Sequence, residues 1–442
     1  MRRRLEAQLE NWRARTTGRL PLLLNGARQV GKTHLLREYG ATHFVNTAYV
    51  NFETNPHAAA YFDDDIAPET VIRYLETETG QPIVAGQTLI VLDEIQSAPR
   101  ALTSLKYFAE SAPQFHVAAA GSLLGVAIHR EEQSYPVGNV TSLTLRPLDF
   151  EEFLWGMGED RLADDIRTAY TDRSALPEAL HRRALDSYRR YLVVGGMPRA
   201  VSAVATSGSL LGVAEIHQDI INDYAADMAK YATAAEAVKI RAAYASLPAQ
   251  LAKDNRKFQY KLAARGGTAT VFGAAIDWLV FAGVVNRCER VDPPVMPLAA
   301  YRDLAAFKLY MGDTGLLVSA SAFPANLLLS GSSDASFMGA IAENYVAQSL
   351  AANGIPLYYW TSDNRAEVDF VVQLGDDIVP VEVKAGTNTR SRSLSVFAGR
   401  YDPPYVVRVS AKPLGWDPPV KSVPLYAVHC LQASRPTAPS GQ

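Results

Sequence analysis

A glycine-rich loop near the N-terminus lies between a short apolar segment, residues 20–24, and a helical pattern that begins near Lys32. The loop reads Gly-Ala-Arg-Gln-Val-Gly-Lys-Thr and matches the pattern G-x-x-x-x-G-K-[ST]. Glycines at both ends let the backbone wrap closely around a phosphate, whose charge then meets backbone N–H groups and the helix N-terminus. The sequence therefore predicts a strand, loop and helix that bind ATP through Gly26, Ala27, Arg28, Gln29, Val30, Gly31, Lys32 and Thr33.

An acidic pair completes the predicted ATP site. The apolar segment 88–92 is followed directly by Asp93 and Glu94, as expected for a strand that delivers carboxylates to one edge of a sheet. In this prediction Lys32 reaches the β and γ phosphates, and Thr33 and Asp93 hold Mg²⁺. Glu94 is the predicted catalytic base, which polarises the attacking water.

Ser122 follows the apolar segment 116–120 and is a candidate sensor beside the γ-phosphate. Each element also has a plainer explanation: the glycine loop as a chance turn, Asp93 and Glu94 as a solvated strand end, and Ser122 as an ordinary turn serine. The loop and the acidic pair occur together in the context that the mechanism requires, which favours a nucleotide site.

The first third of the chain alternates apolar segments with helical patterns, which is typical of a parallel α/β sheet. Strands are expected at residues 20–24, 48–52, 88–92, 116–120 and 140–145, with a helix at 101–111. Residues 159–231 carry helical patterns, interrupted by Gly-Gly-Met-Pro at 195–198. Residues 232–320 contain three helical patterns and then two strands, 284–288 and 307–311, which indicate either a winged-helix module or another small α+β insert.

The C-terminal third places carboxylates and a lysine on two adjacent strands. A helix is expected at 337–351 and strands at 357–360, 367–373 and 378–384. Alternation puts Glu382 and Lys384 on one face, and a hairpin turn brings Asp369 beside them, with Glu343 on the helix as a third carboxylate. Such a group is able to bind Mg²⁺ and cut a phosphodiester, with Asp369, Glu382 and Lys384 catalytic and Glu343, Asp369 and Glu382 as metal ligands. The alternative is the exposed face of a half-buried sheet.

Composition excludes several classes of protein. The 442 residues carry 43 Lys and Arg against 46 Asp and Glu, so no overall basic charge indicates nucleic acid as a partner. Two cysteines, Cys288 and Cys430, are too few for a disulfide framework. The low cysteine count indicates the reducing environment of the cytoplasm. We expect no membrane-spanning segment, because no apolar run approaches the roughly 20 residues that cross a bilayer.

An ordered series of motifs resembles bacterial and archaeal AAA-type ATPases that carry a C-terminal domain of unknown function with the restriction-endonuclease-like PD-(D/E)xK fold. The resemblance is carried by residues 26–33, 89–96, 147–154, 195–198, 307–317, 343–344, 359–360, 367–370 and 382–384. It implies a multidomain α/β protein: a P-loop NTPase (AAA-like) core at 1–158, a helical lid at 159–231, a winged-helix module at 232–320, a nuclease-like domain at 321–432 and a disordered tail at 433–442. Asn139 stands where many relatives have a basic residue, so an arginine finger would fall to Arg130 or Arg146.

Two functions follow from this organisation. In the first, ATP and Mg²⁺ drive a switch that controls a C-terminal unit able to cut DNA or RNA. In the second, the chain is a regulatory ATPase whose C-terminal unit binds a partner protein or nucleic acid without cutting. The three residues Asp369, Glu382 and Lys384 favour the first, and the near-neutral net charge favours the second. A homo-oligomer is compatible with both.

Overall fold

The apolar segments of the first third form a five-stranded sheet. The computed structural model describes residues 1–122, 138–254, 256–331, 337–362, 366–387 and 392–432, and the chain divides into two compact units. The first unit comprises Met1–Arg146 together with Phe281–Gly283. Its strands are β1 (Leu22–Asn25), β2 (Asn46–Asn51), β3 (Thr88–Asp93), β4 (His116–Ala120) and β5 (Thr141–Thr144). They pair in parallel in the order β2-β3-β4-β1-β5, which confirms the predicted parallel sheet.

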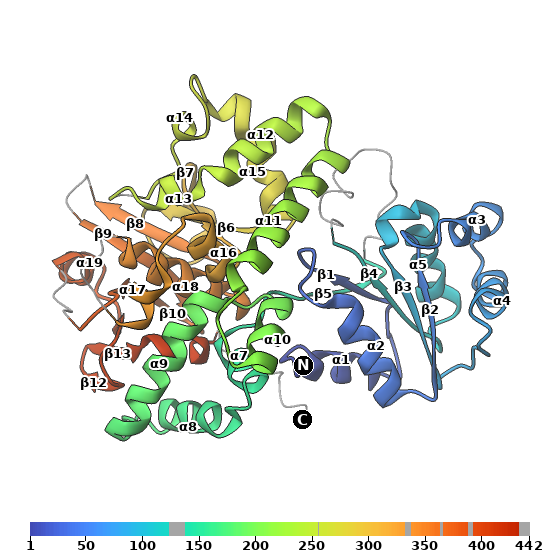
Figure 1. Cartoon of the computed structure of the whole chain (residues 1–442), viewed down its shortest axis with the longest axis horizontal. Helices are drawn as coiled ribbons and strands as arrows, with labels where there is room; N and C mark the ends of the chain where they lie inside the picture. The colour runs from blue at the N-terminus through green and yellow to red at the C-terminus, as the bar shows by residue number, and fades with distance from the viewer. Residues whose placement is uncertain (123–137, 255, 332–336, 363–365, 388–391, 433–442) are drawn as a thin grey trace. The chain divides into compact units, whose positions relative to one another are not determined.

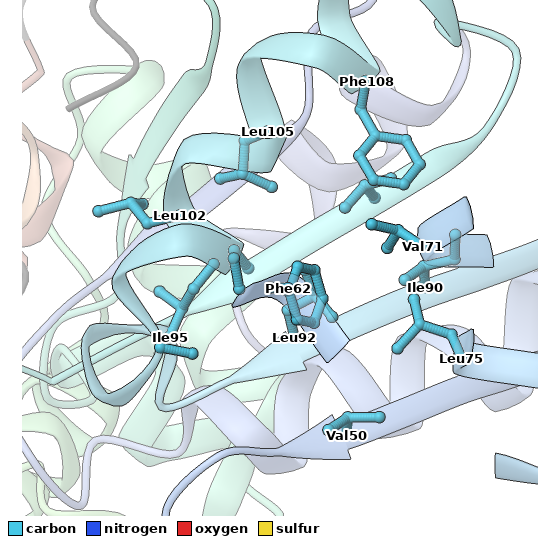
Figure 2. Packing of buried hydrophobic residues seen from close by; sticks show 14 of the residues in the cluster. Val50, Phe62, Val71, Leu75, Ile90, Leu92, Ile95, Leu102, Leu105 and Phe108 are labelled. Carbon is cyan, nitrogen blue, oxygen red and sulfur yellow. The ribbon is translucent and has the colours of Figure 1, made fainter. Parts of the chain in front are cut away.

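The helices of the first unit pack on this sheet (Figure 1). They are α1 (Glu6–Arg13), α2 (Lys32–His43), α3 (His57–Asp64), α4 (Pro68–Thr79) and α5 (Pro99–Ser111). The strand β3 is buried along its whole length, as expected for a central strand of a parallel sheet. Figure 2 shows side chains of α3, α4 and α5, among them Phe62, Val71 and Leu105, packed against Val50 and Ile90 of the sheet. This core holds the strand ends in fixed positions.

Side chains of β2 alternate between the two faces of the sheet. Ala48 and Val50 belong to the core cluster of α3, α4 and α5. Thr47, Tyr49 and Asn51 therefore lie on the opposite face, where α2 packs on β2 and β3. The polar face of β2 thus lies beneath the helix that follows the glycine-rich loop.

The second unit comprises Pro147–Val280 and Val284–Gln442 and begins with helices. They are α7 (Phe150–Gly156), α8 (Asp160–Thr171), α9 (Glu178–Val194), α10 (Pro198–Ser207), α11 (Val213–Lys230), α12 (Ala234–Ala245), α13 (Leu247–Leu251), α14 (Tyr260–Ala263) and α15 (Ala269–Phe281). The division between the two units falls after Arg146. Leu148 is bound within the second unit, since its N–H donates to the carbonyl of Gly196 and its carbonyl accepts from the Tyr191 hydroxyl. The domain boundary expected at residue 158 stays a prediction.

The Gly-Gly-Met-Pro segment separates α9 from α10, and two of its residues require glycine. Gly195 has a φ of 68°, and a Cβ on Gly196 would lie 2.0 Å from the carbonyl oxygen of Leu148. The N–H of Gly196 donates to the buried carboxylate of Asp313 at 2.5 Å. This buried carboxylate also caps α16 (Thr314–Ala320) by accepting from the N–H of Leu316.

An eight-stranded mixed sheet forms the core of the second unit. Its strands are β6 (Val285–Val291), β7 (Arg302–Met311), β8 (Tyr358–Ser362), β9 (Ala366–Leu374), β10 (Asp377–Val383), β11 (Val406–Ser410), β12 (Gly415–Asp417) and β13 (Val420–Pro424), in the order β12-β13-β11-β10-β9-β8-β6-β7. The helices α17 (Ala325–Leu329), α18 (Met338–Ala352) and α19 (Arg392–Tyr401) complete it. No described helix is long and apolar enough to cross a membrane.

The two strands predicted as a wing belong to this same sheet. β6 pairs antiparallel with β7, as predicted, but it also pairs in parallel with β8 through Glu289 and Tyr358. The sheet therefore continues across the boundary predicted at residue 320. The winged-helix and restriction-endonuclease-like assignments stay predictions, as does the role of the preceding helices as a lid. The predicted disordered tail, 433–442, lies outside the described residues.

Candidate functional site

The glycine-rich loop adopts a conformation that depends on its glycines. It connects β1 to α2, and its backbone has positive φ at Gly26 (148°), Gln29 (65°) and Gly31 (96°). A Cβ on Gly26 would lie 2.2 Å from the carbonyl oxygen of Leu145, so only glycine fits there. Gly31 ends the loop in the left-handed region, and α2 begins at the next residue. The loop and the N-terminus of α2 thus form the strand, loop and helix that the motif predicts.

Lys32 points back over this loop. Its Nζ donates to the carbonyl oxygens of Gly26 and Ala27, each at 2.9 Å, and the residue is buried. The ammonium group therefore lies against the backbone of the loop, where a phosphate would need a positive charge.

Asp93 lies at the end of β3 opposite the first turn of α2. Its Oδ2 accepts from the Thr33 hydroxyl at 2.7 Å, and its Oδ1 accepts from the N–H of Glu94 at 3.0 Å. Two further donors come from the neighbouring strand β2: the Tyr49 hydroxyl at 2.9 Å and the Asn51 amide at 3.4 Å, both to Oδ2. Burial raises the pKa of Tyr49 above its ordinary value, so its hydroxyl remains a donor at neutral pH.

The surroundings of Asp93 fit a divalent cation. The carboxylate is fully buried, and among the described residues it has these four donors but no ion-pair partner. A buried carboxylate without a counter-charge is unfavourable, and a hard cation with oxygen ligands is the usual compensation. Thr33 and Asp93 together offer the hydroxyl and carboxylate oxygens that Mg²⁺ prefers.

Glu94 follows Asp93 in a left-handed conformation, with a φ of 50°. Its Oε2 accepts from the Gln96 amide at 2.5 Å and from the Ser122 hydroxyl at 3.2 Å. The structure therefore brings Ser122 beside the predicted catalytic base, as expected for the end of the adjacent strand β4. Sequence reasoning missed Tyr49, Asn51 and Gln96. The signal for the first two is that β2 also ends at the carboxyl edge of the sheet.

Arg130 and Arg146 were the predicted candidates for an arginine finger. Arg130 lies outside the described residues. Arg146 follows β5 and is half-buried, and desolvation lowers the pKa of its guanidinium. Asn139 precedes β5 in a bend of the chain.

Glu343, predicted as a C-terminal metal ligand, is held by protein cations. It lies on α18 and is buried, and its carboxylate forms ion pairs with Arg256 and with Lys308, the latter at 3.1 Å. The Tyr310 hydroxyl also donates to it. Lys308 has no exposed surface and reaches a second carboxylate, Glu367, at 2.5 Å. The charge of Glu343 is thus balanced within the protein.

The other predicted C-terminal residues meet at the β9–β10 hairpin. Phe370 pairs with Val381, and Oδ2 of Asp369 accepts from the N–H of Val383 at 2.7 Å. The neighbouring ion pair joins Lys384 to Glu382, at 2.7 Å. The antiparallel pairing confirms the predicted hairpin.

Among the residues that the structure describes, no three or more His, Cys, Asp or Glu side chains are arranged to hold a metal ion. The metal roles of Glu343, Asp369 and Glu382, and the catalytic role of Lys384, stay predictions.

Comparisons with known families match three parts of the chain. Residues 18–154 match the AAA domain. Residues 185–327 and 338–427 match two domains of unknown function, DUF8612 and DUF4143. No curated protein matches the sequence. The matched AAA segment includes the glycine-rich loop, Asp93, Glu94 and Ser122, so the first unit carries an AAA-type ATPase domain with a P-loop on a parallel sheet.

Solved structures are similar only distantly. A Walker-type ATPase of Pyrococcus abyssi is 16% identical, with a TM-score of 0.41, over 72% of this chain and 93% of that chain. The ORC2 protein of Aeropyrum pernix, in ADPNP–ADP complexes, is 15% identical, with a TM-score of 0.39, over 78% and 95%. AMPPCP-bound DnaA from Aquifex aeolicus is 12% identical, with a TM-score of 0.26, over 62% and 84%. Likenesses at this level assign no function to the chain.

Proposed function

We propose that the chain binds and hydrolyses ATP with Mg²⁺, and that the nucleotide state of the first unit controls the second. The observation that carries the first part is the contact between Thr33 and Asp93, at 2.7 Å, beside the glycine-rich loop. A hydroxyl at the start of a helix and a buried carboxylate at a strand end form the arrangement that holds a metal-bound triphosphate.

The residues of the site have distinct tasks in this proposal. When ATP binds, the ammonium group of Lys32 exchanges its hydrogen bonds to the carbonyls of Gly26 and Ala27 for contacts with the β and γ phosphates, whose charge it neutralises. Thr33 and Asp93 would hold Mg²⁺, which would supply positive charge to offset the negative charge of the phosphates. The loop N–H groups and the N-terminus of α2 orient the phosphate chain.

Glu94 is the general base of the proposed reaction. It takes a proton from the attacking water, whose oxygen bonds to the γ-phosphorus while the bond to the β–γ bridging oxygen breaks. Gln96 and Ser122 both donate to Oε2 of Glu94, which holds the carboxylate at the edge of the sheet where the loop also lies. Oε1 is the oxygen that these two donors leave for the water.

For the second unit, the ion pairs of Glu343 favour binding without cleavage. Arg256 and Lys308 supply the positive charge that a metal ion would supply in a nuclease, so the cluster is complete without one. We therefore place the nuclease-like unit in the role of a scaffold that binds a partner protein or nucleic acid under the control of the ATPase.

Two assays test these proposals separately. ATP hydrolysis by the purified full chain, with and without Mg²⁺, tests the ATPase; turnover equal in both, or absent, would contradict it. Incubation of the same protein with labelled DNA and RNA, with and without ATP, Mg²⁺ and Mn²⁺, tests the second unit. Metal-dependent cleavage that is lost in Asp369→Ala would establish the nuclease and overturn the scaffold.

A further inference from the structure

Tyr49 reaches the predicted metal ligand from the neighbouring strand. In the parallel pairing of β2 and β3, Asn51 lies opposite Asp93, and Tyr49 stands two residues earlier on the same face. The Tyr49 hydroxyl spans this offset and donates to Oδ2 of Asp93 at 2.9 Å. This is the same oxygen that accepts from Thr33.

The other donors to Asp93 do not replace this contact. The N–H of Glu94 binds Oδ1 and leaves Oδ2 to the side chains of Thr33, Tyr49 and Asn51. The Asn51 amide lies 3.4 Å away, which is long for a hydrogen bond that fixes an orientation. Its own oxygen is already held by the N–H groups of Glu53 and Thr54, each at 2.9 Å, so the amide is not free to approach. Tyr49 is therefore the strong donor to Oδ2 from β2.

The Tyr49 ring is itself held by the helix that carries Thr33. The guanidinium of Arg37 lies over the ring, 5.1 Å from its centroid. Arg37 is four residues after Thr33 on α2, so the two side chains lie on the same side of that helix. Tyr49 thus contacts both elements that contribute to the site, α2 through Arg37 and β3 through Asp93.

We propose that Tyr49 is a positioning residue of the Mg²⁺–ATP site, whose hydroxyl holds the Asp93 carboxylate with Oδ2 towards Thr33. The inference rests on the proposed ATP site. A carboxylate fixed on both oxygens binds a metal at lower entropic cost than one that rotates. Removing the hydroxyl should therefore weaken the binding of Mg²⁺ and leave the binding of metal-free ATP unaffected, because in the proposed site Lys32 and the loop N–H groups bind the phosphates and Tyr49 acts only on Asp93.

The variant Tyr49→Phe keeps the ring and its contact with Arg37 and removes only the hydroxyl. ATP affinity of the full chain is measured by calorimetry in EDTA and over a series of Mg²⁺ concentrations, followed by hydrolysis over the same series. ATP affinity should increase with Mg²⁺, and the Mg²⁺ concentration at half of this increase is the measured quantity. We expect it to rise about tenfold in Tyr49→Phe, because the variant loses one hydrogen bond to a charged group. Affinity in EDTA and turnover at saturating Mg²⁺ should stay within about twofold of wild type.

Tyr61→Phe is the matched control. The Tyr61 hydroxyl also donates to a carboxylate of the first unit, Oε2 of Glu78 at 3.1 Å, but away from the loop and β3. It should leave the Mg²⁺ dependence unchanged. An unchanged Mg²⁺ dependence in Tyr49→Phe, or an equal loss of affinity with and without metal, would overturn the positioning role while leaving the ATPase intact. If the wild-type chain binds no ATP, both the proposed ATP site and the positioning role of Tyr49 are wrong. If it binds ATP without hydrolysing it, the Mg²⁺ dependence of ATP affinity still tests Tyr49.

Discussion

The hydroxyl of Thr33 and the carboxylate of Asp93 lie 2.7 Å apart, although 60 residues separate them in the chain. One stands in the first turn of α2 and the other at the end of the fully buried strand β3. The contact joins the phosphate-binding loop to the acidic edge of the sheet, so substitutions in either element should affect the same chemistry.

Replacing Lys32 with alanine should abolish ATP hydrolysis and greatly weaken ATP binding, because it removes the charge that lies over the loop. Hydrolysis and calorimetric binding of the full chain measure the effect. Lys106→Ala, on the exposed face of α5, is the control and should change neither. Wild-type turnover in Lys32→Ala would show that the nucleotide lies elsewhere.

Glu94→Gln should separate binding from turnover. The amide has nearly the same shape as the carboxylate but accepts no proton, so ATP should still bind while hydrolysis falls by a factor on the order of 10²–10⁴. Glu110→Gln, an exposed position in α5, serves as the comparison. If Glu94→Gln loses binding as completely as Lys32→Ala does, Glu94 holds the nucleotide and is not the base.

Lys308→Met should destabilise the second unit by about 3–5 kcal/mol, because it leaves the buried carboxylate of Glu343 and the half-buried carboxylate of Glu367 with less positive charge. Urea denaturation of the full chain, followed by fluorescence, measures this change. Lys308→Met combined with Glu343→Gln should recover part of the loss. If Mg²⁺ or Mn²⁺ instead restores Lys308→Met to wild-type stability, the cluster is a metal site and the scaffold proposal is wrong.

Gly196→Ala should destabilise the second unit by about 1–3 kcal/mol, the usual range for a side chain forced into a filled space. Its new Cβ would meet the backbone of Leu148, which cannot turn aside as a side chain does. Gly273→Ala, within α15, meets no atom within 4 Å and should be neutral or slightly stabilising. Equal unfolding midpoints for the two variants would contradict the close approach.

Stability of the first unit should fall as the solution is acidified from pH 6.5 towards pH 4. Burial lowers the pKa of His116 from 6.5 to about 4, so the folded chain holds the neutral ring in a range where the unfolded chain binds a proton. Because the unfolded chain binds this proton and the folded chain does not, the free energy of unfolding decreases as the pH falls. The stabilisation that is present above pH 6.5 is therefore lost between pH 6.5 and pH 4. The variant His116→Phe keeps an aromatic ring beside Trp12 and Phe44. It should reduce the pH dependence of the urea concentration at the midpoint of unfolding. The control His57→Phe, at an exposed position, should leave this pH dependence unchanged.

Sequence patterns predicted the first unit well because central strands of a parallel sheet are continuous apolar runs and the loop motif stands at a fixed place beside one of them. Strand order was not available from such patterns, and for this reason Tyr49 and Asn51 were missed: their role follows from β2 lying next to β3. Glu343 was predicted as a third carboxylate and a metal ligand, whereas its partners, Lys308 and Arg256, come from distant segments without any local signal.

The continuation of one sheet from β6 to β13 also has a consequence for the order in which the protein is made. All five strands of the first sheet lie within residues 1–146, so that sheet has its full complement of strands while most of the chain is still to be synthesised. β6 and β7, in contrast, leave the ribosome well before β8, the strand that covers the second edge of β6. Until β8 arrives, this edge is an unpaired template for other strands, and we expect nascent chains halted between residues 311 and 358 to be the ones most in need of a chaperone.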